Sequence, residues 1–237
     1  MTGAGSGRFD QNESRLLSRP YPSSDDRGAV AVTTNIYVDG FNLYYGLRRW
    51  GPGHKWLDLE KLANLSFPQH SVKRVRCFSA RVRSRPPDLQ KPVRQDIDWQ
   101  ALETLPRVSL FAGDFRSDVK RFYSPSLGKT IDVVREEEKG SDVNLATYLL
   151  LDAFRADCEQ AVVISNDGDL KESLRVVGEE FGKRVVLLSL LNPHMHRNRV
   201  LPCGEYRPLR QGVVAASQFP VRLRGTRGQL LRRPTGW

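Results

Sequence analysis

The sequence predicts an α/β fold, a three-layer sandwich with a mainly parallel central sheet. Two short apolar runs, 161–164 and 185–188, show no polar alternation, which is typical of strands buried on both faces of a parallel sheet. Segments with apolar residues at helical spacing lie beside them, and strands that alternate with helices favour this architecture. The length of 237 residues is sufficient for one domain with a sizeable core.

The elements of the first half follow in chain order. Residues 33–38 are β-branched and aromatic and predict a strand, and the apolar spacing of 41–47 predicts a helix packed on a sheet. A second strand is expected over 71–82, where apolar residues occur among basic ones. A helix over 88–105 follows two prolines, and another strand covers 108–111.

The second half begins with a segment whose pairing the sequence leaves open. Residues 121–123 and 129–135 predict a hairpin or an extended flap. Over 141–155, apolar residues recur at helical spacing for several turns, which predicts a helix. A further helix is expected over 170–181, between the two apolar strands, and Gly182 ends it.

Composition divides the chain into three parts. Residues 1–30 are rich in Gly, Ser, Arg and Asp and poor in large apolar groups, which predicts a flexible N-terminal arm. Residues 31–210 contain the predicted strands and helices and form the expected domain. Residues 211–237 form an Arg-rich C-terminal extension.

The net charge of +10 and the pI of about 9.8 indicate a polyanionic partner such as nucleic acid, although a membrane surface satisfies the same electrostatics. No apolar run approaches the ~18 residues that span a bilayer, and the first residues lack a signal-peptide pattern. We therefore expect a cytoplasmic protein. Cys77, Cys158 and Cys203 are odd in number and widely spaced, which predicts reduced thiols instead of disulfides or a zinc site.

Positive charge is concentrated in two stretches. Residues 197–237 contain nine arginines and one glutamate, and residues 73–85 contain six basic residues and no acidic one. We expect both stretches to contact nucleic acid, with Phe219 and Trp237 either stacking on bases or anchoring the C-terminal extension to the domain. The side chains selected for nucleic-acid contact are Arg81, Arg83, Lys139, Arg222, Arg224 and Arg227.

Three short acidic segments lie where a strand or a charged turn gives way to a predicted helix. They are VDGFN at 38–42, KGSD at 139–142 and SNDGD at 165–169. In a parallel α/β sheet, ligands gather outside the carboxyl ends of the strands, so these segments are expected to meet in space. Carboxylates are hard ligands that suit Mg²⁺ or Mn²⁺, and several brought together repel one another unless a cation or a proton lies between them.

Asp39, Asp142 and Asp167 are the candidate metal ligands. Asp169 can bridge or hold a second ion through water, and Asn42, one helical turn beyond Asp39, can orient substrate or a metal-bound water.

Each candidate has a structural alternative. Asp169 with Glu172 has the spacing of a capping box, Asp142 can cap its helix in competition with Ser141, and Asp39 followed by glycine is common in turns.

The remaining acidic and imidazole groups are assigned no role in the site. Asp152 lies ten residues beyond Asp142, roughly 80° away around the same helix. Asp132 and the glutamates at 136–138 are interpreted as solvated charge near the flap. The four histidines, His194 and His196 among them, are scattered without partner ligands.

The three acidic segments together resemble the signature of the NYN domain, in particular the LabA-like branch of PIN-like nucleases. The matching stretches are VDGFNL at 38–43, EKGSDVNLA at 138–146 and SNDGDL at 165–170. The resemblance covers about residues 33–210 and implies a PIN-like fold in which acidic residues hold Mg²⁺ or Mn²⁺ and cleave RNA. The chain departs at Asn166, where the family commonly has a small residue, and retains Asp167 and Asp169.

The first functional hypothesis is a metal-dependent ribonuclease that acts on single-stranded or structured RNA. The second is an RNA-binding adaptor that keeps the fold with little or no turnover, which the basic charge fits equally well. A Mg²⁺-dependent phosphatase is less favoured, because Gly40-Phe41 follows Asp39 in place of an Asp-x-Asp motif. DNA as a substrate and a homo-oligomeric state are left open by the sequence.

Overall fold

The computed structural model describes residues 31–190 and 204–237. The predicted arm over 1–30, and His194, His196 and Cys203, lie outside the described residues. The central sheet has the strand order β4-β3-β2-β1-β5-β6-β7, and neighbouring strands are parallel except β3 and β4. The strands are β1 (Val32–Asp39), β2 (His70–Ala80), β3 (Val108–Ser124), β4 (Lys129–Lys139), β5 (Gln160–Ile164), β6 (Arg184–Ser189) and β7 (Glu205–Pro208).

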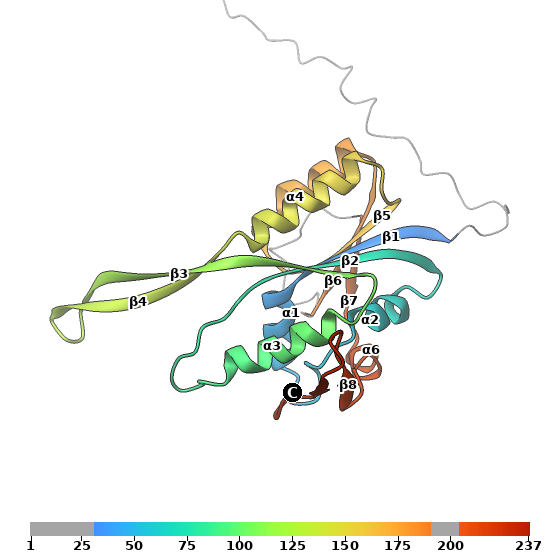
Figure 1. The fold of residues 1–237 in the computed structure, drawn as a ribbon. Helices are drawn as coiled ribbons and strands as arrows, with labels where there is room; N and C mark the ends of the chain where they lie inside the picture. The colour runs from blue at the N-terminus through green and yellow to red at the C-terminus, as the bar shows by residue number, and fades with distance from the viewer. Residues whose placement is uncertain (1–30, 191–203) are drawn as a thin grey trace, which may run out of the picture. The chain divides into compact units, whose positions relative to one another are not determined.

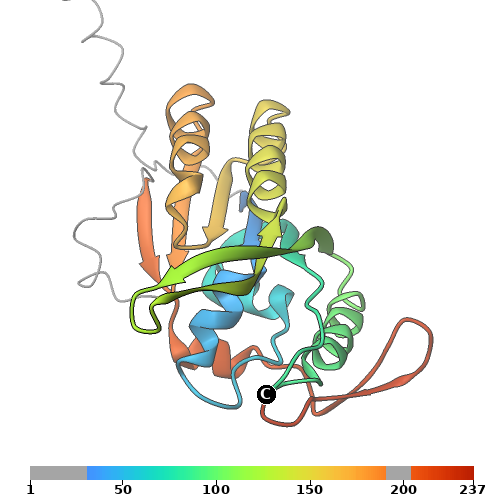
Figure 2. The same ribbon diagram turned by 90° about the vertical axis from the view of Figure 1, so that its left-hand side faces the viewer.

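Helices cover both faces of this sheet (Figure 1). On one face lie α1 (Gly40–Arg48), α2 (Leu59–Ser66), α3 (Lys91–Leu102) and α6 (Gln211–Ala216). On the other face lie α4 (Ser141–Phe154) and a helical run formed by η2 (Gly168–Leu170), α5 (Lys171–Arg175) and η3 (Val176–Glu180). Figure 2 shows α4 and this run side by side. The predicted three-layer sandwich is confirmed.

Alternating side chains of β1 explain why two layers of helices form. Ile36 and Val38 point into the core shared with α1 and α2, whereas Tyr37 points into the core shared with α4. All three side chains are at most 2% exposed. A strand without polar alternation therefore requires helices on both of its faces.

The sheet reverses its direction of growth beside β1. β1 pairs with β2 on one side and with β5 on the other, and Val38 lies opposite both Cys77 and Ile164. A crevice outside the carboxyl ends of two such strands is the usual ligand site of an open α/β sheet. Asp39 ends β1 at this position.

Several elements differ from the sequence prediction. β3 extends far beyond 108–111, because its second half pairs with β4 in a long antiparallel hairpin that projects from the sheet (Figure 1). The predicted helix over 170–181 is instead a succession of 3-10, α and π turns. The short elements α2, β7 and α6 were not predicted, because each has too few residues for a periodic signal.

The C-terminal residues pack on the layer that contains α1 and α3. β8 (Arg222–Arg224) and β9 (Leu230–Arg232) form a small hairpin that contacts α3. Phe219 is 6% exposed, and its ring lies 5.4 Å from that of Trp56. The anchoring alternative is therefore the one found, and Phe219 is too buried to stack on a base.

A buried ion pair fastens α4 to the sheet. The Arg76 guanidinium donates two hydrogen bonds of 2.9 Å to Asp152, and the Tyr37 hydroxyl donates a third of 2.8 Å. The guanidinium also lies 4.6 Å from the centre of the Tyr148 ring. Arg76, a member of the basic stretch at 73–85, is thus a core residue and not a contact for nucleic acid. Asp152 lies outside the acidic centre, as predicted.

Replacement of Asp152 by alanine is expected to reduce the free energy of unfolding by about 3–5 kcal/mol, because the Arg76 charge stays buried without a partner. Urea denaturation measures this loss. The matched control is Asp132→Ala, which removes an exposed partner of Arg121 and should cost less than about 1 kcal/mol. Equal losses in the two variants would contradict the assignment.

Candidate metal centre

Three carboxylates from separate segments meet at the carboxyl end of β1. One oxygen each from Asp39, Asp142 and Asp167 lies within 4.8 Å of the other two. Asp39 is 6% exposed, Asp167 is partly buried and Asp142 is open to solvent. The structure thus brings together the three aspartates selected from the sequence, and their role as metal ligands remains a prediction.

Asp39 is held in place by three hydrogen bonds. Its Oδ1 accepts from the backbone N–H of Asn42 at 3.0 Å, which caps α1. Its Oδ2 accepts from the Asn42 side-chain amide at 2.6 Å and from the Ser165 hydroxyl at 2.8 Å. The capping alternative and the metal role are therefore compatible, because carboxylate oxygens have further lone pairs. Gly40 is required here, since a Cβ would lie 2.9 Å from the Phe78 carbonyl oxygen.

Asp167 belongs to a loop that is tied to the same group of residues. Its N–H donates to the Ser165 hydroxyl oxygen at 3.0 Å, and its Oδ1 accepts from the N–H of Asp169 at 3.0 Å. The Asn166 backbone N–H donates to the side-chain Oδ1 of Asn42 at 3.4 Å. The side-chain amide of Asn42 is therefore hydrogen-bonded to both acidic segments, through Asp39 and Asn166. It positions Asp39 and the loop, whereas the sequence suggested contact with substrate or water.

Asp142 does not cap its helix. The cap residue of α4 is Gly140, whose φ of 93° is left-handed and favours glycine, and no side chain bonds to the cap. The Asp142 carboxylate lies in the first turn of α4, where the helix dipole favours negative charge. The capping alternative is therefore wrong for Asp142, and its side chain is available to a ligand.

Asp169 lies beside the cluster but outside the group of three. Its exposed side chain makes no hydrogen bond within the described part of the chain, and Glu172 pairs with Arg175 instead. The proposed capping box is consequently absent. The negative charge of Asp169 still acts on Asp142.

The pKa values of two acidic groups at the centre, Asp142 and Glu138, are raised. Asp142 is exposed on one side, but partial desolvation of its carboxyl is the main cause that raises its pKa to about 6, followed by the charges of Asp39, Asp167 and Asp169. Burial also raises the pKa of Glu138 to about 7, opposed by the Ser141 hydroxyl and reinforced by Asp142 and Asp39. Negative charge on Asp142 and Glu138 is therefore disfavoured in the folded protein, and a cation bound beside them would offset this cost.

Glu138 is the acidic neighbour that the sequence interpretation missed. It was interpreted as solvated charge, yet its Oε1 is buried and has no hydrogen-bond partner among the described residues. Its position as the penultimate residue of β4, just before the turn to α4, is the signal that could have identified it. An unsatisfied carboxylate oxygen beside three others fits a cation better than it fits a closed hydrogen-bond network.

The predicted nucleic-acid contacts lie in separate places. Arg81 pairs with Asp96 at 3.0 Å, and Arg83 donates to the Phe115 carbonyl oxygen at 3.2 Å, both near the base of the β3–β4 hairpin. Lys139 is exposed and ends β4, three residues before Asp142. The three selected arginines of the C-terminal extension, Arg222, Arg224 and Arg227, lie on or beside the β8–β9 hairpin next to α3.

The donor set fits a hard divalent cation such as Mg²⁺ or Mn²⁺. Each of three segments supplies one carboxylate, which leaves coordination positions for water and a phosphate oxygen. Asp142 lies on the solvent side, so an anionic substrate can approach the centre. The fold and the site together define an α/β protein with an acidic centre at the switch point of its sheet.

Comparison with known proteins places this chain in a family. The NYN domain matches residues 33–202, and the protein belongs to the NYN domain family, within the PIN-like nuclease superfamily. The match does not separate branches of the family, so the LabA-like assignment stays a prediction. No helix within the described residues is both long and apolar enough to cross a membrane.

Two individual proteins are similar to this chain. The 6-hydroxy-3-succinoylpyridine 3-monooxygenase HspA of Pseudomonas putida is 24% identical over an alignment of 249 positions, which covers 87% of this chain and 75% of that protein. A crystal structure of a protein of unknown function from Vibrio parahaemolyticus superposes with a TM-score of 0.51 at 14% identity, over 78% of this chain and 98% of the other. The second likeness supports the fold alone.

Mn²⁺ is expected to raise the melting temperature of the protein. At a Mn²⁺ concentration of one hundred times its dissociation constant, binding adds about 2.7 kcal/mol to the free energy of unfolding. Asp39→Asn, Asp142→Asn and Asp167→Asn should each lose most of this shift in differential scanning fluorimetry. Asp132→Asn, on the exposed hairpin, is the control and should keep it. A full shift in all three site variants would exclude the centre.

Without a metal, Asp142→Asn should melt at a higher temperature than the natural protein at pH 8. The folded-state pKa of Asp142 is raised, so its contribution to stability is present at low pH and is lost as pH rises through about 6. The difference between the two proteins should disappear near pH 4. A lower melting temperature of the variant at pH 8 would contradict this expectation.

Proposed function

We propose that this protein is a metal-dependent ribonuclease that hydrolyses phosphodiester bonds at the centre formed by Asp39, Asp142 and Asp167. The observation that carries the proposal is the convergence of three carboxylates in a protein with a net charge of +10. Acidic residues gathered in a basic chain indicate that a cation mediates contact with an anionic substrate. Membership of the NYN family supports nuclease chemistry.

In this proposal, some residues fix the geometry of the centre and others face the substrate. Asp39 is buried and fixed by Ser165 and Asn42, so it provides a rigid reference point. Asp142 and Asp167 are more exposed and face the incoming phosphodiester. A bound divalent ion supplies neutralisation of phosphate charge and activation of water for attack.

The β3–β4 hairpin is proposed to guide RNA to the centre. It joins α4 through Lys139 and Gly140, so its base lies beside Asp142. Phe122 and Tyr123 are 46% and 66% exposed on its outer part, which provides aromatic surfaces for unpaired bases. Single-stranded RNA is therefore the preferred substrate in this proposal, and structured RNA and DNA are to be compared with it.

The alternative is a regulatory adaptor that binds RNA without cleaving it. Its basic surface would be the same, and only turnover separates the two functions.

A second candidate follows from the name of the Pseudomonas putida relative, which describes oxygenation of a hydroxylated pyridine. The observation that favours a small-ring substrate is a cavity between α1 and α3, lined partly by Asp98.

Purified protein should cleave labelled single-stranded RNA with Mn²⁺ or Mg²⁺ and not with a chelator. Asp39→Asn and Asp167→Asn should reduce the cleavage rate by at least about a hundredfold. Asn42→Ala should reduce it by about 10–100-fold, because it orients Asp39. Undiminished cleavage by the aspartate variants would remove the proposed centre, and salt-sensitive binding without cleavage would favour the adaptor.

Lys139→Ala and Arg83→Ala are each expected to weaken RNA binding. Each should also reduce the slope of the logarithm of the binding constant against the logarithm of the salt concentration by about one. Filter binding with the Asp39→Asn protein measures this without cleavage. Arg175→Ala is the matched control, because Arg175 is occupied by three glutamates on its own helical run. Loss of affinity in the control equal to that in the two test variants would contradict a specific surface.

A further inference from the structure

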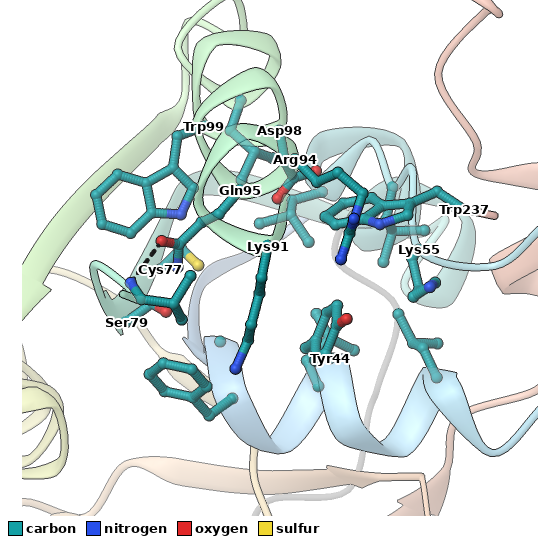
Figure 3. A pocket seen from close by; sticks show the side chains of 18 residues that line it. Tyr44, Lys55, Cys77, Ser79, Lys91, Arg94, Gln95, Asp98, Trp99 and Trp237 are labelled. Atoms are coloured by element: carbon teal, nitrogen blue, oxygen red, sulfur yellow. Dashed lines mark hydrogen bonds between the residues drawn. The ribbon is translucent and has the colours of Figure 1, made fainter. Parts of the chain in front are cut away.

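A small cavity lies between α1 and α3 and is closed at one side by the C-terminal residue Trp237 (Figure 3). The volume that the centre of a water molecule can reach is about 90 Å³. One water needs roughly 10–15 Å³ by this measure, so the cavity has room for roughly six to nine non-hydrogen atoms. That is one six-membered ring with its substituents, and a fused double ring is too large.

Two polar groups in the cavity wall have no partner. The Asp98 carboxyl makes no hydrogen bond or ion pair within the described residues, although it lines the cavity. The indole N–H of Trp237 is buried without an acceptor, and Trp237 is 7% exposed. Asp98 is partly exposed because it faces the cavity, so its carboxyl is open to a ligand, whereas the Trp237 indole nitrogen is sealed from solvent. A ligand in the cavity can therefore supply the hydrogen bonds that the Asp98 carboxyl lacks.

The walls of the cavity suit a flat ring. Phe41 and Tyr44 of α1, Trp99 of α3 and Trp237 all line it, together with leucines from the surrounding elements. Figure 3 shows Asp98, Arg94 and Trp237 on the side opposite Tyr44. Aromatic walls with a few polar groups are typical of sites for planar ligands.

A basic groove adjoins the cavity. The groove has a volume of about 520 Å³, and Tyr44, Lys55, Lys91 and Arg94 line both spaces. Its basic residues are Arg48, Lys55, Arg83, Arg85, Lys91 and Arg94, against one acid, Asp88. Arg94 pairs with Asp88, and the remaining cations leave a clear excess of positive charge. An anionic group attached to the ring therefore fits the groove.

We propose that this cavity and groove bind a pyrimidine nucleotide, with the base between Asp98 and Trp237 and the phosphate beside Lys91. A neutral carboxyl donates one hydrogen bond and accepts another, which matches the N3 acceptor and the N4 amino donor of cytosine. Burial raises the pKa of Asp98 to about 8, so the carboxyl is mainly protonated at pH 7. Uracil presents its O4 acceptor beside its N3–H donor, which match the same two groups of the carboxyl, so both pyrimidine bases fit.

The nucleotide can be free or part of an RNA chain. Gly40 and Phe41 line the cavity and directly follow Asp39, so the site adjoins the acidic centre along α1. The binding proposal does not depend on cleavage. It can be tested in the Asp39→Asn protein, so its failure is distinguishable from failure of the proposed function.

The experiment is calorimetric titration of the full chain at pH 7 with CMP, UMP, AMP and cytidine. CMP and UMP should bind within about threefold of each other, because each base makes two hydrogen bonds to the neutral carboxyl. AMP should bind more weakly than both, and cytidine should lose affinity for lack of a phosphate. If a cytidine-ended oligonucleotide binds more tightly than CMP, the ligand of the cavity is the end of an RNA chain. If the oligonucleotide binds more weakly than CMP, the ligand is the free nucleotide.

Variants of the cavity make the test specific. Asp98→Leu should bind CMP at least about tenfold more weakly, whereas Asp98→Asn keeps a donor and an acceptor and should stay within about threefold of the natural protein. Asp96→Leu is the control, because Asp96 lies on the same helix and pairs with Arg81 at the surface. Asp98→Leu should also melt at a higher temperature without ligand, since a partly buried carboxyl that lacks a partner is removed.

Three results would overturn the proposal. The first is the absence of CMP binding at millimolar concentration, and the second is undiminished CMP binding by Asp98→Leu. The third is a preference for a pyridine monocarboxylate such as nicotinate over CMP. A lower melting temperature of Asp98→Leu, with CMP affinity retained relative to the folded fraction, would assign Asp98 a structural role instead.

Discussion

Three carboxylates are held within 4.8 Å of one another at the end of β1, and the surrounding segments are arranged to keep them there. Asp39 cannot move away from its neighbours, because Ser165 and both amide groups of Asn42 tie it to the loop after β5. The parallel pairing of β1 with β5 sets the positions of Asp39 and Asp167, which follow these two strands. The β3–β4 hairpin ends just before α4 and so places Asp142 beside them. The fold therefore places three carboxylates at one point, an arrangement that a divalent cation would stabilise.

Three buried or partly buried aspartates illustrate how partners decide the role of one residue type. Asp152 is fully satisfied by Arg76 and Tyr37 and fastens α4 to the sheet. Asp39 is satisfied on its inner side and shares its outer side with other acids. Asp98 has no partner within the described residues and faces a cavity. Residues of one type thus have three different surroundings: Asp152 pairs with a cation, Asp39 adjoins other acids and Asp98 faces a cavity.

The family and its similar proteins fit the principle that function resides in sites placed on a fold. The NYN domain match and the Vibrio parahaemolyticus structure establish a common architecture. The Pseudomonas putida relative carries the name of a monooxygenase at 24% identity, so related chains differ in the chemistry attributed to them. The acidic centre and the cavity on the α1 side of the sheet are two places where such differences can arise.

The α/β class, the main strands and helices, and the meeting of three aspartates were predictable from the sequence, because buried parallel strands and strand ends have strong local signals. The burial of Arg76 in the core, the anchoring of Phe219 and the place of Glu138 beside the centre became visible in the folded chain. Each of these depends on a partner distant in the chain. Asp98 and Trp237 show this most clearly, since contact between the C-terminus and α3 has no periodic pattern and follows from packing alone.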